Sequence, residues 1–435
     1  LFVIVLAAVL GTLLAQPSVA VPHYPPAILT SIAGAPFVSE ADDDADLTGV
    51  QIFVAGGLQS QPANAGGIAA LLAETIVRTP VRIEGQPPVA ARDAIQHAGG
   101  TLSYTIDGTT AHYYIEARPE KIGALVAAFE TAMAKPDFSG GTISAARKSL
   151  DTRIDQSEGN PLSVGIAMFK HSYYLNGAGS PAMGSVASLS GIDAPQLATF
   201  YAATYRRGGL SVSAVGRVTP SLTGALHALA DALPQGAPGP VSPAVKTLSA
   251  TNSTRIIAQR DVAAPFLVVG FGAPSPGDKD FGPMLLIESM LATSFDRSVA
   301  TTPSLAERTV SAFYLYDSSP ASFVVFVNGA RVEPTLGLRE LLLVTQSLAQ
   351  KKMESDSLGR FKAAATGAFL SDSLTLADRS YIIGTLERQG LGADAMNAAL
   401  DAVAHTSAED VQRVAKRYLQ KYIVAIVLPR NGSSE

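Results

Sequence analysis

The chain has 435 residues, of which 47% are hydrophobic and 16% are charged, and its formal net charge is -5. This length is sufficient for two domains, each with its own core. A weakly acidic chain without a run of Lys and Arg lacks the electrostatic footprint of a nucleic-acid-binding protein. There is no Cys and there are 6 His. Disulfides and thiolate ligands are therefore excluded, and any metal site must use His or carboxylates.

The first 20 residues have the pattern of a signal peptide. Residues 1–14 are an uncharged apolar run, and small residues follow up to Ala20. This pattern predicts cleavage after Ala20 and an exported protein, periplasmic or secreted, with no membrane contact after cleavage. The alternative is a retained anchor, although the run is shorter than the roughly 20 apolar residues of a membrane span. Residues 21–46 are Pro-rich and then acidic, which predicts an extended lead-in.

Residues 47–233 predict a first α+β domain. Alternating and β-branched runs predict strands, and apolar residues at helical spacing predict helices. Asp107-Gly108 between two β-prone runs is typical of a hairpin turn. In chain order we expect a strand at 49–55, a helix at 67–77, a hairpin over 99–117, helices at 119–134, 144–156, 164–174 and 194–205, and a strand at 210–215.

Residues 255–435 repeat this order about 210 residues later, which predicts a second domain of the same fold. Residues 234–254, which begin with a Pro- and Gly-rich segment and continue with Ser and Thr, form the expected linker. The fold class is thus two homologous domains, each a mostly antiparallel sheet with packed helices. The second domain is expected to have strands at 265–272, 310–316, 322–328 and 423–428 and helices at 282–291, 334–350, 358–370, 377–390 and from Ser407.

Several segments resemble the pitrilysin/insulinase family of zinc metallopeptidases, from about Leu47 to the end of the chain. Val50-Gln-Ile-Phe-Val-Ala-Gly-Gly57 followed by Gly67-Ile-Ala69 resembles the first strand and the start of the family's metal-binding helix. Residues 100–114 look like its edge strand and the partner of that strand. Residues 197–206 and 210–216 resemble the end of its first domain. The resemblance implies two homologous α+β domains around a chamber.

The family's zinc motif is missing its functional residues. In His-x-x-Glu-His, two imidazoles one helical turn apart bind Zn²⁺, and the Glu acts as general base on the metal-bound water. Ala70 stands at the first His, Ala73 at the Glu and Glu74 at the second His. Asp151 stands where a helix further along supplies a third ligand, Glu. We therefore expect no catalytic residue, no metal ligand and no bound cofactor, although zinc is typical of the family.

Other polar residues are expected to be structural. Glu74 is interpreted as a solvated helix residue, and the alternative is that Glu74 and Asp151 face each other and hold a hard cation weakly. His112 alternates with apolar neighbours in a strand, which favours a structural role. In the second domain, residues 304–313 resemble a substrate-contacting segment of the family in which Ala306 replaces an Arg.

These expectations favour a proteolytically inactive subunit. The resemblance implies that such a chain pairs with a catalytically active paralogue to form a peptide-binding chamber. One alternative is an active metallopeptidase with an unusual site. The other is a stand-alone scaffold that holds extended peptides by strand addition along an edge strand formed by Leu102, Ser103, Tyr104, Thr105 and Ile106.

Overall fold

The computed structural model describes residues 23–83, 87–175, 177–239, 254–300, 309–318, 320–328 and 333–430, and of residues 254, 292–300 and 309 it describes the backbone alone. Within these ranges no helix combines the length and the apolar character that crossing a membrane requires. The predicted signal peptide and most of the predicted linker lie outside the described residues.

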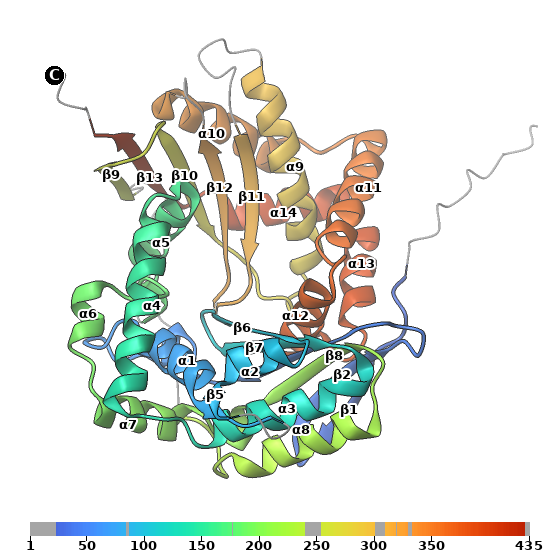
Figure 1. The fold of residues 1–435 in the computed structure, drawn as a ribbon. Helices are drawn as coiled ribbons and strands as arrows, with labels where there is room; N and C mark the ends of the chain where they lie inside the picture. Colours follow the sequence, from blue (N-terminus) through green and yellow to red (C-terminus); the bar gives the residue numbers. More distant parts are fainter. Residues whose placement is uncertain are drawn as a thin grey trace, which may run out of the picture.

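Six strands form the sheet of the first domain in the order β1-β2-β8-β3-β7-β6 (Figure 1). The β2–β8 pair is parallel, and the other neighbours are antiparallel. The strands are β1 (Ile28–Ile32), β2 (Ala35–Ala41), β3 (Thr48–Val54), β6 (Thr101–Ile106), β7 (Ala111–Ala117) and β8 (Ser211–Gly216). A separate two-stranded sheet joins β4 (Pro80–Val81) to β5 (Val89–Ala90).

The sheet of the second domain has five strands in the order β11-β12-β10-β13-β9. This order matches β6-β7-β3-β8-β2 strand for strand, and the β9–β13 pair is parallel like β2–β8. The prediction of a repeated, mostly antiparallel α+β fold is therefore confirmed. The strands are β9 (Thr254–Arg260), β10 (Phe266–Gly272), β11 (Thr309–Leu315), β12 (Ser322–Asn328) and β13 (Tyr422–Pro429).

Strands β1, β2 and β9 differ from the sequence-based expectation. Residues 28–41 are not a lead-in outside the domain, because β1 and β2 form an antiparallel hairpin that joins the first sheet through β8. The repeat opens with β9 rather than with residues 265–272, since β9 pairs in parallel with the last strand of the chain. Strands β2 and β9 pair with partners far away in the sequence, which local periodicity does not reveal.

Helices cover the outer face of each sheet, and many begin with the capping residues that free backbone N–H groups require. Ser139, Asn160, Asp193 and Ser407 each accept a hydrogen bond from the first turn that follows. The first-domain helices are α1 (Ile68–Arg78), α2 (Ala91–His97), α3 (Pro119–Ala134), α4 (Gly140–Glu158), α5 (Pro161–Tyr173), α6 (Val186–Ser190), α7 (Ala194–Thr204) and α8 (Pro220–Ala232). The second-domain helices are α9 (Phe281–Ala300), α10 (Pro334–Gln350), α11 (Ser355–Ser371), α12 (Leu376–Leu386), α13 (Ala395–His405) and α14 (Ala408–Tyr418).

Each domain supplies a helix to the sheet of the other. Helix α5 packs on β10, β12 and β13, and α12 packs on β3 and β8 (Figure 1). Glycines permit both close approaches: a Cβ on Gly270 would lie 2.1 Å from the Phe169 ring, and one on Gly384 would lie 2.4 Å from the Phe53 ring. The Ser213 hydroxyl also donates to the Ser380 carbonyl oxygen at 2.5 Å. Each domain thus covers the inner face of the other domain's sheet with one of its helices.

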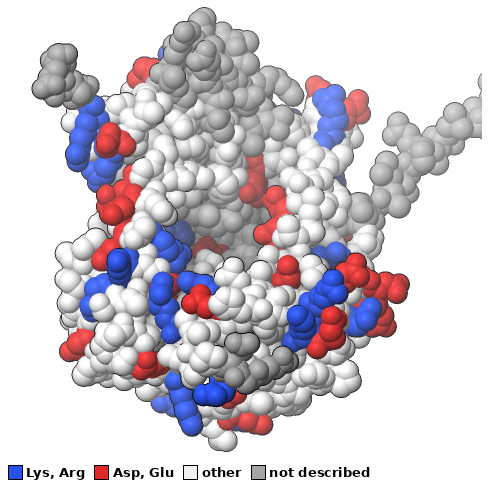
Figure 2. Space-filling view, viewed as in Figure 1, with Lys and Arg blue, Asp and Glu red and all other residues white. Residues whose placement is uncertain are grey.

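The surface is hollowed between the two domains (Figure 2). The β6–β7 turn of the first domain meets the β11–β12 turn of the second. There the Thr109 hydroxyl donates to the Asp317 carbonyl oxygen at 3.3 Å, and the Tyr174 hydroxyl donates to the Pro320 carbonyl oxygen at 2.9 Å. Strand β6 therefore lies next to the junction of the two domains.

Replacing Gly384 by Ala tests the reciprocal packing. In an open helix this change stabilises by up to about 1 kcal/mol, but here the new methyl meets the buried Phe53 ring, and overpacking costs about 1–3 kcal/mol. We expect G384A to lower the free energy of unfolding in urea. The control is G367A in α11, where a Cβ has open space and should stabilise the protein. Equal stability of the two variants would contradict this packing.

Candidate functional site

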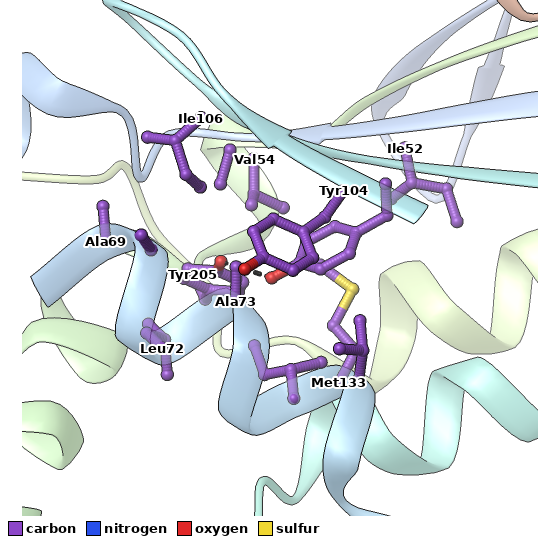
Figure 3. Packing of buried hydrophobic residues seen from close by; sticks show 14 of the residues in the cluster. Ile52, Val54, Ala69, Leu72, Ala73, Tyr104, Ile106, Met133 and Tyr205 are labelled. Carbon is purple, nitrogen blue, oxygen red and sulfur yellow. Dashed lines mark hydrogen bonds between the residues drawn. The ribbon is translucent and has the colours of Figure 1, made fainter. Parts of the chain in front are cut away.

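Helix α1 is the element on which the resemblance places the metal-binding motif, and it is buried. Every residue from Ile68 to Val77 is buried, including Ala70 and Ala73. Gly67 enters the helix with φ of 90°, and a Cβ there would lie 2.7 Å from the Met183 carbonyl oxygen, so glycine is required. Figure 3 shows Ala69 and Ala73 facing Ile106 and Tyr104 of β6. The methyl groups of Ala69 and Ala73 therefore lie on the face of α1 that packs against β6.

Glu74 is fully buried, with an exposed fraction of 0%. Its Oε1 accepts hydrogen bonds from Nε of Arg78 at 2.7 Å and from Nη1 of Arg92 at 3.3 Å. Its Oε2 accepts from Nη2 of Arg92 at 3.2 Å and lies 3.8 Å from Nη1 of Arg153. The interpretation of Glu74 as a solvated residue is wrong. Three guanidinium groups instead surround one carboxylate in the interior.

The electrostatics of this cluster keep Glu74 ionised. Burial alone would raise its pKa, but the charge of Arg92 and hydrogen bonds from Arg92, Tyr104 and Arg78 outweigh burial, so the pKa is lowered. Both carboxylate oxygens are occupied by these donors. A zinc ion would have to displace them and approach three positive charges, with no imidazole available to bind it. The residues present do not fit the zinc of the family.

The arginine cluster, defined as Arg78, Arg92 and Arg153, joins four elements. The guanidinium carbons of Arg92 and Arg153 lie 5.9 and 5.3 Å from the centre of the Tyr104 ring, within the range of a cation–π contact. Arg153 also donates to the Tyr104 hydroxyl at 2.7 Å. The cluster thus ties α1, α2 and α4 to β6. Sequence reasoning missed it, although Arg78 stands four residues after Glu74, the spacing of a helical ion pair.

Asp151 does not join this network. It lies on α4, which packs against α1, but the groups that contact Glu74 are the arginine cluster and Tyr104. Its Oδ1 is buried without a hydrogen-bond partner in the described part of the chain. Among the described residues no group of three or more His, Asp or Glu side chains is arranged to hold a metal ion. Residues 301–308, which include Ala306, lie outside the described residues.

Strand β6 ends the first sheet, where the resemblance placed an edge strand. The side chains of Leu102, Tyr104 and Ile106 are buried against α1, and those of Ser103 and Thr105 are exposed on the opposite face. The Asp107 N–H donates to the Thr110 carbonyl oxygen at 3.0 Å, so these two residues form a hydrogen-bonded pair. Hydrogen-bonded and non-hydrogen-bonded pairs then alternate along the β6–β7 hairpin. By that alternation, the backbone groups of Leu102, Tyr104 and Ile106 point to the free edge.

The second domain contains a counterpart of the Glu74–Tyr104 contact without arginines. Tyr314 of β11 pairs with Phe323 of β12. Glu288 of α9 accepts the Tyr314 backbone N–H at 2.9 Å. Burial raises the pKa of Glu288 to about 8, with a smaller contribution from Asp372. Glu74 and Glu288 therefore have opposite pKa shifts, because Glu74 has cationic partners.

Replacing Glu74 by Gln tests the arginine cluster. Removing the carboxylate leaves three cations without their shared partner, so E74Q should lower the free energy of unfolding by about 2–4 kcal/mol at pH 7. The folded pKa of Glu74 lies below that of the unfolded chain, so this stabilisation is present above about pH 4.3 and lost as the pH falls through the folded pKa. The difference in urea denaturation should shrink in acid. E409Q, which breaks an exposed ion pair with Lys352, should change little.

Replacing Glu288 by Gln should have the opposite pH dependence. Since the folded pKa is raised to about 8, the wild-type protein loses stability as the pH rises from about 4.5 to 8. Gln does not titrate and can still accept the Tyr314 N–H. The stability of E288Q relative to wild type should therefore increase between pH 5 and pH 8 in urea denaturation. A constant difference across this range would contradict a neutral Glu288.

No protein-family model and no curated protein matches the chain. Its structure is similar to that of a protease from Helicobacter pylori, with a TM-score of 0.80 and 13% identity over 94% of this chain and 100% of the other. It is similar to a peptidase M16 inactive domain from Pseudomonas fluorescens, with a TM-score of 0.78 and 16% identity over the same shares. A chain of complex III2 from Candida albicans gives a TM-score of 0.75 and 12% identity over 92% of this chain and 95% of that one. The chain therefore has the two-domain fold of M16 peptidases, the pitrilysin/insulinase fold that the resemblance implied.

Proposed function

We propose that this chain is a proteolytically inactive M16 homologue that holds extended peptides on β6 and forms a peptide-binding chamber with a catalytically active paralogue. One observation carries the first part: Glu74, the acidic side chain that α1 places at the motif positions, is buried and held by the arginine cluster. Hydrolysis by this mechanism needs a metal-bound water and a base to deprotonate it. Ala73 supplies no base, and α1 supplies no imidazole.

The geometry of β6 supports peptide binding. Its outward backbone groups can hydrogen-bond an added strand, the mode of recognition in which main-chain bonds give affinity and side-chain pockets give specificity. The strand lies next to the junction of the domains, so a bound peptide would run along the hollow between them (Figure 2). Nothing in this mode requires a metal ion.

The catalytically active partner is inferred from the structural features that this chain shares with the family and from those that it lacks. The two-domain frame and the edge strand are intact, whereas the hydrolytic residues are replaced. Such a combination suits a subunit that helps to bind substrate while another subunit cleaves it. The similar Pseudomonas fluorescens structure is described as an inactive domain, and the Candida albicans chain belongs to a larger assembly. Export is likewise proposed, from the pattern of residues 1–20.

Peptide binding is tested with a fluorescein-labelled ten-residue peptide rich in Val and Thr and with the same peptide N-methylated at alternate amides. Methylation removes donors to the β6 edge, and each lost hydrogen bond is worth about 1 kcal/mol, or about fivefold in affinity. We expect the methylated peptide to bind the purified chain at least tenfold more weakly in fluorescence anisotropy. Equal affinity would exclude strand addition.

Partnering is tested by adding the purified chain to a homologue from the same organism that carries His-x-x-Glu-His. We expect the two to co-elute in gel filtration and peptide cleavage to increase, whereas this chain alone with Zn²⁺ should cleave nothing. Cleavage unchanged by addition of this chain would contradict the partnership. Chelator-sensitive cleavage by this chain alone would instead support the alternative of an active peptidase.

A further inference from the structure

A pocket of about 380 Å³ lies on the exposed face of β6, between the first sheet and residues of the second domain. The β6 side chains Ser103 and Thr105 form part of its wall. Its charged lining residues are all acidic: Asp107 from the β6–β7 turn, Asp317 from the β11–β12 turn and Asp378 from α12. The two domains therefore build this pocket together.

His112, at the base of this pocket, offers a hydrogen-bond acceptor that is not used. Gln51 donates through Nε2 to the Ala377 carbonyl oxygen at 3.3 Å, which directs its Oε1 to Nδ1 of His112 at 3.1 Å. Nδ1 is therefore the protonated nitrogen, and Nε2 carries a lone pair. Within the described residues this Nε2 is buried without a partner, in a side chain only 6% exposed. Burial lowers the pKa of His112 to about 4, so the ring stays neutral at pH 7.

The carboxylates around this acceptor are incompletely compensated. Asp107 accepts backbone hydrogen bonds from Thr109 and Thr110, yet burial and the charge of Asp317 raise its pKa. Lys170 lies 3.5 Å from Asp317, and the charge of Arg388 acts on Asp107. The carboxyl groups of Asp107, Asp317 and Asp378 thus lie around one pocket, and Asp107 is only partly ionised near pH 7 because its pKa is raised to about 7. A further positive group with N–H donors would balance the charge and satisfy His112.

The position of β6 identifies where such a group comes from. Successive side chains of a strand point to opposite faces, so a peptide paired with β6 directs every second side chain over Ser103 and Thr105. We propose that this acidic pocket binds a basic side chain, Lys or Arg, of a peptide held on β6, with its N–H groups donating to Nε2 of His112 and to the carboxylates of Asp317 and Asp378. This inference rests on the proposed peptide binding.

The test compares three labelled ten-residue peptides that differ at one central position, which is Lys, norleucine or Glu. Norleucine keeps the length of the Lys stem without its charge. With the full chain we expect the Lys peptide to bind about tenfold more tightly than the norleucine peptide, and the Glu peptide to bind most weakly. In D317N and D378N the preference for Lys should fall to twofold or less, while affinity for the norleucine peptide stays unchanged.

The matched control is D356N, the same change at an exposed position of α11 that does not line the pocket. It should keep the full preference for Lys. A Lys preference that survives in both D317N and D378N would overturn the inference. Equal binding of all three peptides that remains sensitive to N-methylation would overturn this inference alone, whereas no binding of any peptide would overturn the proposed peptide binding with it.

Discussion

A carboxylate without contact with water must be neutralised or paired, and this constraint determines the character of the first domain. Glu74 satisfies it with three guanidinium groups from α1, α2 and α4. Arg92 and Arg153 in turn contact the ring of Tyr104 in β6, and Arg153 also donates to its hydroxyl. Positive charge thus surrounds the position that the resemblance assigns to a zinc ligand. This charge is supplied by guanidinium groups, which cannot activate a water molecule as a metal ion does.

The contrast between the domains shows how local surroundings set the state of an acid. Glu288 lies against β11 as Glu74 lies against β6, yet it accepts a backbone N–H and its pKa is raised, not lowered. The framework of strands is equivalent in the two cases. The difference comes from the arginines, which the second domain lacks among the groups that act on Glu288. Two buried carboxylates of the same chain therefore have opposite pKa shifts.

Much of the fold could be predicted from the sequence because its signals are local. The helix at 119–134 has the predicted bounds, and the Asp107-Gly108 turn predicted the β6–β7 hairpin. The places of strands β2 and β9 in their sheets could not be predicted, because they depend on the distant partners β8 and β13. That the motif positions of the resemblance offer no imidazole and no general base was readable at Ala70, Ala73 and Glu74. The burial of Glu74 was not, since Arg92 and Arg153 reach it only after folding. The acidic pocket likewise combines residues of both domains.

The reciprocal placement of α5 and α12 has a consequence for the origin of the chain. Each half lacks the helix that covers the inner face of its own sheet and receives it from the other half. This is the arrangement of a domain-swapped dimer whose two subunits have become joined in one polypeptide. Neither half can be excised as an autonomous folding unit without exposing Phe266, Val268 and their neighbours on one sheet or Phe53 on the other. The two halves are therefore interdependent in their folding, although their side chains differ.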